Sequence, residues 1–521
     1  MKKLFASLLL AAVTALSLAA CGSSAPAPGN SVPVSGNGSV LIYGSGSFTR
    51  INPAMDEHGE INLLLFNGLT AHDGENNVVP CLAGSWDFDR DSCTYTFHLV
   101  EGVRWHDGEA FTAGDVKFTV ESIMDPENAS ENAPNFEDVE EITVIDEHTI
   151  SFRLAAPNVA FLDYMTMPVL PEHLLAGEDM QTSAFFRAPV GTGPYKLAEW
   201  DEGQAVTLVR SEDYFKGAAG IETIIFKFVP DDSARTLQLR SGELDLAQLT
   251  PRDAQTFTGD ENFAVYRMTT SDYRGIMFNF NNPYWDENRE MIPAICCAID
   301  RQAIVDSVLL GCGESAYGPL QRNVYNNPDA ERWDYDPVRA ETILLDSGYE
   351  KRSDGFYYRG DQRAAFVLNA PSGDRVRLEI AQAAAQQLRE VGIDCSVEIP
   401  TVVDWGGQMA YLIGWGSPFD ADDHTYKVFG SGKGANYSGY SNAAVDRYLS
   451  LARETDDDAG RAEYYDAFQL ELSHDPAFAF ICYVDADYVA AAGLEGISAD
   501  TVMGHHGVGI FWNVAEWTIT K

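Results

Sequence analysis

The stretch Leu82–Val116, LAGSWDFDRDSCTYTFHLVEGVRWHDGEAFTAGDV, decides how the rest of the chain is interpreted. Within it, apolar and polar side chains alternate along Ser85–Phe88 and again along Thr94–Leu99, which is the period of a β-strand. The residues between them, Asp89–Ser92, have the composition of a turn, so this stretch predicts a β-hairpin. Thr112 is then placed to cap a helix, and strands mixed with helices indicate an α/β protein.

Further strands and helices are predicted on both sides of this hairpin. Strands are predicted at 40–43, 142–145, 150–154, 195–200, 206–210 and 274–279, and helices at 61–69, 113–124 and 304–310. From 365 to 399 the predicted order is strand, helix, strand, with Asp374 as the helix cap and Gly392 as its end. The sequence shows no internal repeat. We therefore expect two α/β lobes, with a β-rich insertion in the first.

The first 39 residues have the layout of an export signal followed by a tether. Residues 1–20 combine Lys2 and Lys3 with an apolar run, which is typical of a signal peptide. The sequence before Cys21 resembles a bacterial lipobox, in which the cysteine carries the lipid; the alternative is an ordinary signal peptide with a chance cysteine. The segment after Cys21, through residue 39, contains no charged side chain and predicts a flexible linker.

Composition excludes several classes of function. The 521-residue chain has a formal net charge of −43, so it lacks the basic surface that nucleic acid or an anionic membrane would require. No segment after the signal peptide is long and apolar enough to span a bilayer. The seven cysteines after Cys21 match no zinc spacing, and most are expected to be small core residues.

Motifs of catalysis are missing from the sequence. "GSGSF" is not a nucleophile elbow, "GSGKGA" is not a phosphate-binding loop, and no H-E-x-x-H occurs. We expect no enzyme activity, no cofactor and no metal site; His424, His505 and His506 are expected to be surface or core residues. Two alternatives stay open: an exported hydrolase using a carboxylate pair, and a sensor or chaperone on the same fold.

Several blocks of sequence, in this order, resemble family 5 of the bacterial extracellular solute-binding proteins, the peptide and nickel-chelate receptors of ABC importers. The blocks are Leu82–Val116, GTGPYKLAEW at 191–200, the segment 278–320 beginning FNFNNPYW, GYSNAAVDRYL at 439–449, and the lipobox. Together they cover nearly all of the chain after Ser39. The resemblance implies a two-lobed, type II periplasmic-binding-protein-like fold that closes on its ligand.

The resemblance also implies an organisation and partners. The first lobe would comprise residues 40–271, including an inserted subdomain at about 69–190; the second would comprise 272–489, and 490–521 would return to the first. A monomer, held by its lipid on the extracytoplasmic face of the membrane, would deliver a short peptide or a nickel chelate to an ABC permease with ATPase subunits.

One loop of the second lobe is expected to hold the ligand. In the peptide receptors of the family that this sequence resembles, a Trp in this loop is followed by an acidic residue that binds the α-amine of the peptide. Trp415 matches that Trp, but Pro418 occupies the position of the acidic residue. The pattern WGSPFD is closer to the nickel-chelate receptors, yet their first-lobe arginine corresponds to Met167 or Pro168 here. Both ligand classes therefore stay open.

Nine residues are candidates for ligand binding, each with a structural alternative. Trp415 and its neighbour Gly416 could offer an indole face to a ligand, or the Trp could be a core residue. Three carboxylates could bind an amine or a cation, or could cap the next segment: Asp420, Asp422 and Asp423. Tyr43 and Ser45 lie where the cleft of the resembling family begins. Asn279 and Asn281 could offer their amide groups to the backbone of a ligand, or could form a turn.

Overall fold

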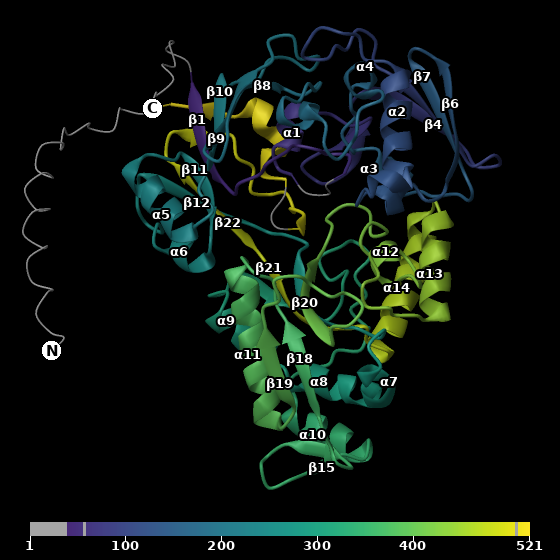
Figure 1. Ribbon diagram of the computed structural model, residues 1–521, viewed down its shortest axis with the longest axis vertical. Helices are drawn as coiled ribbons and strands as arrows, with labels where there is room; N and C mark the ends of the chain where they lie inside the picture. The colour runs from purple at the N-terminus through teal and green to yellow at the C-terminus, as the bar shows by residue number, and fades with distance from the viewer. Residues whose placement is uncertain (1–38, 56–58, 506–508, 521) are drawn as a thin grey trace, which may run out of the picture. The chain divides into compact units, whose positions relative to one another are not determined.

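The computed structural model describes residues 39–55, 59–505 and 509–520. The predicted signal peptide, Cys21 and the linker up to residue 38 lie outside the described residues, as does His506. Figure 1 shows two large sheets within the described part of the chain, with helices around each. None of the helices in those ranges is long and apolar enough to cross a membrane.

The first sheet combines strands from both ends of the chain. Its seven strands run in the order β12-β22-β11-β1-β10-β9-β8. Their bounds are β1 Val40–Ser45, β8 Tyr195–Asp201, β9 Ala205–Arg210, β10 Thr223–Phe228, β11 Leu246–Leu249, β12 Phe263–Met268 and β22 Ala486–Ala491. β1 pairs in parallel with both β10 and β11, whereas β22 lies antiparallel between β11 and β12.

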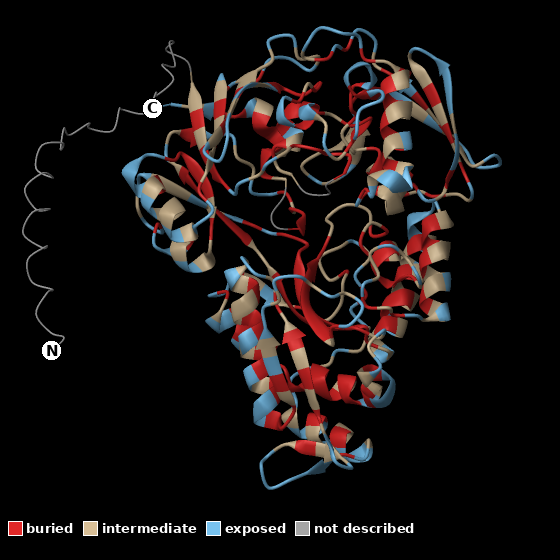
Figure 2. Ribbon diagram, viewed as in Figure 1, coloured by how far each residue is buried: buried red, intermediate tan, exposed pale blue. Residues whose placement is uncertain are grey.

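The second sheet has six strands in the order β14-β21-β13-β20-β18-β19. Their bounds are β13 Tyr273–Phe278, β14 Gly313–Ser315, β18 Ala365–Asn369, β19 Asp394–Glu398, β20 Ala410–Trp415 and β21 Phe478–Val484. Every residue of β13 and β20 is buried, because helices cover both faces of this sheet. Figure 2 shows these central strands in red.

A third sheet contains the hairpin that the sequence predicted. Its order is β4-β5-β7-β6, with bounds β4 Ala83–Asp89, β5 Thr94–Leu99, β6 Val139–Asp146 and β7 Thr149–Leu154. Three small sheets join β2 Thr70–His72 with β3 Val78–Pro80, β15 Glu350–Lys351 with β16 Tyr357–Arg359 and β17 Gln362–Arg363, and β23 Leu494–Glu495 with β24 Thr518–Ile519.

The helices pack on these sheets. In the first half they are α1 Asn62–Leu65, α2 Ala113–Met124, α3 Phe161–Tyr164, α4 Glu172–Leu175, α5 Asp232–Ser241 and α6 Pro251–Gln255. In the second half they are α7 Tyr284–Asn288, α8 Ile292–Ala298, α9 Arg301–Ser307, α10 Pro337–Asp346, α11 Arg375–Val391, α12 Tyr426–Phe429, α13 Ala443–Glu454 and α14 Asp458–His474.

Most of the predicted elements are confirmed, with two corrections at helix ends. Thr112 caps α2, and Asp374 and Gly392 cap the two ends of α11 as expected. The helix predicted over 61–69 is only α1, because Phe66 adopts an extended conformation that leads toward β2. The helix predicted to reach residue 310 ends at Ser307, and Leu310 has a left-handed backbone, with φ of 53°.

Separate hydrophobic cores define the two lobes. One core joins the first sheet with the four-stranded sheet and contains Leu41, Phe97 and Phe226. We call this part the first lobe. The second sheet has one core under α8, α10 and α11 and another under α13 and α14, and we call this part the second lobe. Trp105 is buried in the first core, and Trp86 packs against it.

Two adjacent chain segments connect the lobes. Residues 269–272 lead from β12 to β13, and Asp485 alone separates β21 from β22. The segments contact each other, since Thr270 Oγ1 donates to the carbonyl of Val484 at 2.5 Å. Arg322 Nη1 donates to the Thr270 carbonyl at 2.6 Å and to Asp485 Oδ1 at 2.7 Å. The chain thus returns to the first sheet at 486, slightly before the expected residue 490.

The cysteines are largely core residues, as predicted. All seven described cysteines are free thiols, and six of them are buried: Cys81, Cys296, Cys297, Cys312, Cys395 and Cys482. Burial raises the pKa of the Cys296 and Cys482 thiols to about 12. These two thiols therefore stay protonated and unreactive at neutral pH.

His106, which follows the hairpin in the sequence, forms hydrogen bonds with the segment Gly191–Gly193. Its Nδ1 accepts from the Gly191 N–H at 3.1 Å, and its Nε2 lies 3.0 Å from the Gly193 carbonyl. Both glycines are required here, because a Cβ would lie 1.8 Å from the Leu65 carbonyl oxygen at Gly191 and 2.3 Å from that of Leu64 at Gly193. An imidazole that accepts at Nδ1 must be neutral, and burial lowers the pKa of His106 to about 4.

We expect stability to fall in mild acid because of His106. The unfolded chain binds a proton at the ordinary pKa of 6.5, whereas the folded chain binds it only near 4. Stability is therefore full above pH 6.5 and is lost as the pH falls toward 4, by about 2 kcal/mol at pH 4.5. Urea unfolding between pH 7.5 and 4.5 measures this loss, and His106→Gln should show a shallower pH dependence; equal slopes would contradict the assignment.

Candidate functional site

The candidate site lies where β20 ends, beside the start of β13. These strands are antiparallel neighbours, and Trp415 pairs with Tyr273. Since residue 272 ends one of the two segments that connect the lobes, this end of the second sheet is next to the hinge. A side chain here is held by the rigid centre of one lobe and lies close to the point about which the lobes would move.

Trp415 is nearly enclosed and has an unused donor. Its side chain is 8% exposed, and its Nε1 has no hydrogen-bond partner. Its ring lies 5.4 Å from the ring of His424, and nearly parallel to those of Tyr437 at 6.1 Å and His505 at 6.3 Å, centroid to centroid. Because a buried N–H normally has a partner, this one is available for a ligand.

Two arginines lie together on the opposite face of the same strand. Arg274 from β13 and Arg377 from α11 both pack on Gly414, where a Cβ would lie 2.3 Å from Arg274 Nη1 and 2.9 Å from Arg377 Nη2. The missing side chain of Gly414 therefore makes room for the pair. Arg274 is paired with Asp272 through Nη1.

Arg377 keeps unused hydrogen-bonding capacity. It is 7% exposed and pairs with Asp374 at 3.2 Å through Nε, but Nη2 has no hydrogen-bond partner. Burial and the neighbouring charge of Arg274 lower the pKa of Arg377 to about 10. Two buried cations in contact are costly, and an anion placed between them would relieve that cost. Asp272 and Asp374 already offset part of that cost, and Nη2 of Arg377 could still donate to a further carboxylate.

Asp272 connects the arginines with the tryptophan. Its Oδ1 accepts from Arg274 and lies 2.7 Å from His505 Nδ1. His505, in turn, lies against Trp415. At this end of the sheet an indole and two imidazoles therefore lie on one face, and two guanidinium groups lie on the other. In the described part of the chain, no three metal-ligating side chains gather in one place.

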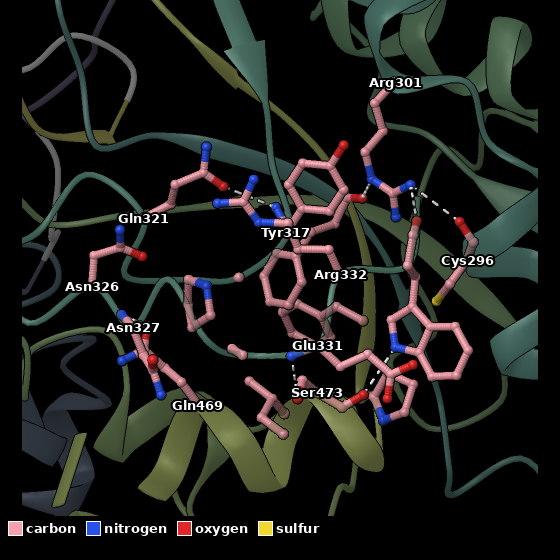
Figure 3. Close-up of a pocket in the computed structure, with 18 residues that line it drawn as sticks. Cys296, Arg301, Tyr317, Gln321, Asn326, Asn327, Glu331, Arg332, Gln469 and Ser473 are labelled. Carbon is pink, nitrogen blue, oxygen red and sulfur yellow. Dashed lines mark hydrogen bonds between the residues drawn. The ribbon is translucent and has the colours of Figure 1, made fainter. Parts of the chain in front are cut away.

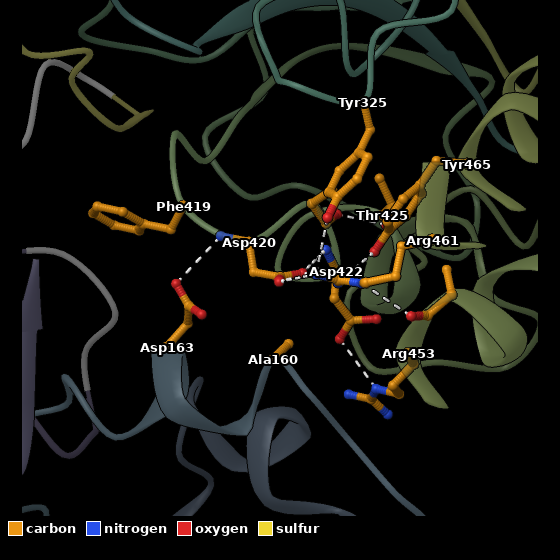
Figure 4. Close-up of polar contacts among 12 residues, drawn as sticks. Ala160, Asp163, Tyr325, Phe419, Asp420, Asp422, Thr425, Arg453, Arg461 and Tyr465 are labelled. Atoms are coloured by element: carbon orange, nitrogen blue, oxygen red, sulfur yellow. Dashed lines mark hydrogen bonds and ion pairs between the residues drawn. The ribbon is translucent and has the colours of Figure 1, made fainter. Parts of the chain in front are cut away.

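The three acidic candidates of the loop all have partners within the protein, and their expected role as partners of a ligand amine stays a prediction. Asp420 accepts from Arg461 in a bidentate pair at 2.7 and 2.8 Å. Asp422 accepts from Arg453 Nε at 3.1 Å and from the Tyr164 hydroxyl at 2.5 Å. Asp423 pairs with Lys427 at 3.1 Å. Figure 4 shows the first two carboxylates turned toward their arginines.

Gly416 is needed for packing, not for an open ligand surface. Its φ is 151°, and a Cβ would lie 1.9 Å from the Ser271 carbonyl oxygen. The loop after Trp415 therefore presses directly against the hinge segment, which only glycine allows. These contacts give Gly416 a structural role, and its role toward a ligand stays a prediction.

Tyr43 and Ser45 differ in what they contact. Tyr43 is 2% exposed and packs between Phe226 and Phe511, while its hydroxyl donates to Glu60 at 2.7 Å. These are the contacts of a core residue, and a role for Tyr43 toward a ligand stays a prediction. Ser45 lines a cavity of about 180 Å³ in the first lobe and remains a candidate.

Asn279 and Asn281 lie beyond the end of β13 that is far from Arg274, so they are not brought to the site. Asn279 is fully buried and donates to the carbonyl of Gln408 at 2.8 Å. The Asn281 N–H donates to Asn279 Oδ1 at 3.1 Å, and its side chain packs on Gly439. Their amides hold a turn, which is the alternative that the sequence left open.

Sequence reasoning missed Arg274 and Arg377, and it expected His505 to be a surface or core residue. A signal for Arg377 was present: it shares a helix face with the buried residues Ala381, Ala384 and Leu388. A charged residue on the apolar stripe of a helix must find a special environment. No comparable signal marks Arg274.

A small enclosed cavity in the second lobe is not a ligand site for a solute (Figure 3). Its volume is about 40 Å³, enough for one or two waters. Arg301 on its wall donates to backbone carbonyls, among them those of Ala316, Phe480 and Trp333 at 2.7–3.0 Å. Through these hydrogen bonds, Arg301 holds a loop of the second lobe in place.

Comparison with known proteins identifies the family. The sequence profile of bacterial extracellular solute-binding proteins, family 5 middle, matches residues 77–437. Protein XP55 of Streptomyces lividans is 33% identical over 471 residues, covering 88% of this chain and 86% of XP55.

Two solved structures are similar over almost their whole length. NikZ from Campylobacter jejuni, in complex with Ni(L-His), has a TM-score of 0.86 and 34% identity, covering 92% of this chain and 99% of that one. AppA from Bacillus subtilis, in complex with a nonapeptide, has a TM-score of 0.81 and 25% identity over the same shares. The chain belongs to family 5 of the bacterial extracellular solute-binding proteins.

Proposed function

We propose that this solute-binding protein captures a small solute that carries a carboxylate, closes on it, and delivers it to an ABC permease. The observation that carries the proposal is Arg377, a 7% exposed cation with an unpartnered Nη2, packed against Arg274 beside the hinge. An arginine pair binds a carboxylate through charge-assisted hydrogen bonds. The Trp415 ring would contact the body of the solute.

Closure would make this binding selective. A ligand favours the closed form only by the difference in its affinity for the two forms. A carboxylate beside Arg377 and an apolar group on Trp415 would be enclosed only when the first lobe covers this end of the second sheet. The permease would then recognise the closed form.

The first candidate ligand is a short peptide bound by its C-terminal carboxylate. The known structure of AppA holds a nonapeptide. The carboxylates of residues 420–423 are paired within the chain, so the α-amine of such a peptide would be held by other groups.

The second candidate is a nickel chelate of an amino acid. It is favoured by the imidazoles of His424 and His505, which both lie against Trp415. NikZ, with 34% identity, was solved with Ni(L-His). An amino-acid chelator carries a carboxylate for the arginine pair and leaves coordination positions for imidazole.

The N-terminal anchor is also part of this proposal. A lipid on Cys21 and the uncharged linker up to residue 39 would keep the two lobes beside the permease on the extracytoplasmic face of the membrane. The folded part is expected to be a monomer.

Mass spectrometry with elemental analysis of residues 22–521, purified without refolding, tests the ligand class. A series of short peptides would support the first candidate, and nickel with an amino acid near one per protein would support the second. A bound solute without a carboxylate would contradict the proposal. Consumption of a mixed peptide pool would indicate the hydrolase alternative.

Trp415→Ala is expected to weaken binding of the co-purified ligand by more than about 1 kcal/mol, because a large aromatic contact is lost. Calorimetry measures this loss. Trp415→Phe keeps much of the ring contact and removes the N–H, so it separates stacking from hydrogen bonding. Unchanged affinity in the alanine variant would remove Trp415 from the site.

A further inference from the structure

The loop after Trp415 contacts the first lobe through groups that the ligand site does not use. Tyr164, on α3 of the first lobe, donates from its hydroxyl to Asp422 of the second lobe at 2.5 Å. Arg453, on α13 of the second lobe, bonds Asp422 at 3.1 Å and continues to Asp138 of the first lobe at 2.8 Å. Each lobe therefore extends one side chain to a carboxylate of the other.

These contacts are buried, so they are not incidental surface pairs. The Asp422 side chain is 0% exposed and that of Arg453 is 6% exposed. Tyr164 is buried in the first-lobe core. A hydrogen bond to a buried carboxylate is stronger than a hydrogen bond to an exposed carboxylate. If the donor is removed, the buried carboxylate is left without a partner, which costs free energy.

A second set of contacts lies beside the first. The ring of His72 stacks on Phe419, with centroids 3.7 Å apart and planes within 5°. His72 Nε2 lies 2.9 Å from Asp163 Oδ1, and the same oxygen accepts from the Asp420 N–H at 3.3 Å. Figure 4 shows Asp163 pointing across to the loop that carries Phe419 and Asp420.

A rim of further pairs surrounds the two sets. Lys433 pairs with Glu137, and the Val159 N–H donates to the carbonyl of Arg453 at 3.0 Å. Arg90 Nη2 donates to the carbonyl of Glu454 at 2.7 Å. All of these contacts join residues 72–164 of the first lobe to residues 419–456 of the second.

We propose that these contacts form a latch that closes the lobes without a ligand. The latch consists of Tyr164, Asp138, His72 and Asp163 of the first lobe with Phe419, Asp420, Asp422 and Arg453 of the second. Its members touch one another directly, and none of them is Trp415, Arg274 or Arg377. The latch therefore stabilises the closed form whether or not the carboxylate site is filled.

The latch determines how much of the free energy of closing the lobes must come from ligand binding. If the closed form is already a substantial fraction of the free protein, the apparent dissociation constant is close to that of the closed form. If the latch is broken, the ligand must also supply the free energy that closes the protein. The apparent affinity then falls in proportion to the decrease in the closed fraction of the free protein. This role also explains Asp422, whose carboxylate accepts from Tyr164 of the first lobe, and Asp420, whose N–H donates to Asp163 of that lobe.

Small-angle X-ray scattering of ligand-free protein tests the latch. Residues 22–521 are unfolded, dialysed to remove ligand, refolded, and checked by mass spectrometry. Wild type is expected to scatter as a mixture rich in the closed form. Tyr164→Phe combined with Asp138→Asn should lower the closed-to-open ratio at least tenfold and increase the radius of gyration.

Tyr195→Phe is the matched control, because its buried hydroxyl donates to the Ile221 carbonyl at 3.0 Å within the first lobe. It should scatter as wild type does. Wild-type scattering that fits the open form alone would overturn the latch, as would a double variant that stays closed, or a control that opens equally. Since no ligand is present, each of these results leaves the proposed ligand class untouched.

Discussion

Arg377→Gln is expected to weaken binding of the co-purified ligand by about 100-fold or more. The substitution removes the cation that would face the ligand carboxylate, and truncating one partner of a buried charge pair costs about 2–5 kcal/mol. Calorimetry with the ligand identified by mass spectrometry measures the loss. Glutamine retains an amide donor, so the variant reports mainly the charge.

Arg375→Gln provides the control for this effect. It lies on the same helix, two residues away, where it pairs with Glu379 at 2.9 Å and is about half exposed. The Arg375→Gln variant should bind the co-purified ligand with the same affinity as wild type. If Arg377→Gln binds as tightly as this control does, the arginine pair does not hold the ligand.

Gly416→Ala is expected to destabilise the protein by about 3 kcal/mol or more. Its Cβ would lie 1.9 Å from the Ser271 carbonyl oxygen, and its φ of 151° is strained for any residue with a side chain. Since the neighbour is backbone of the hinge segment, little relaxation is possible. Urea unfolding monitored by circular dichroism measures the change.

Gly46→Ala is the matched control for this test, because a Cβ at residue 46 would have no other atom within 4 Å. It should change the unfolding midpoint little. A Gly416→Ala variant as stable as Gly46→Ala would mean that the loop does not press on the hinge as described.

The fold could be predicted from the sequence wherever the signal was local. Thr112 and Asp374 are capping residues next to periodic apolar patterns, and Gly392 ends α11 in a left-handed conformation, with φ of 112°. Helix ends without such a residue were predicted less well. Asn62–Leu65 has no side-chain cap, and the apolar residues after it continue in an extended conformation.

The site could be predicted only in part, because its contacts join distant residues. The match to a loop of the resembling family drew attention to Trp415, whose side chain is buried with an unused N–H. Nothing near Asp422 indicates that Tyr164, 258 residues away, is its partner. Carboxylates in a loop suggest ligand contacts until the arginines that neutralise them are known.

The position of β22 has a consequence for how the chain is assembled. This strand lies between β11 and β12, and β12 pairs with no other strand of its sheet. The first sheet therefore cannot attach β12 until residues 486–491 have been synthesised, although β8, β9, β10, β1 and β11 precede them by more than 230 residues. The N-terminal lobe is completed only after every strand of the C-terminal lobe has been made.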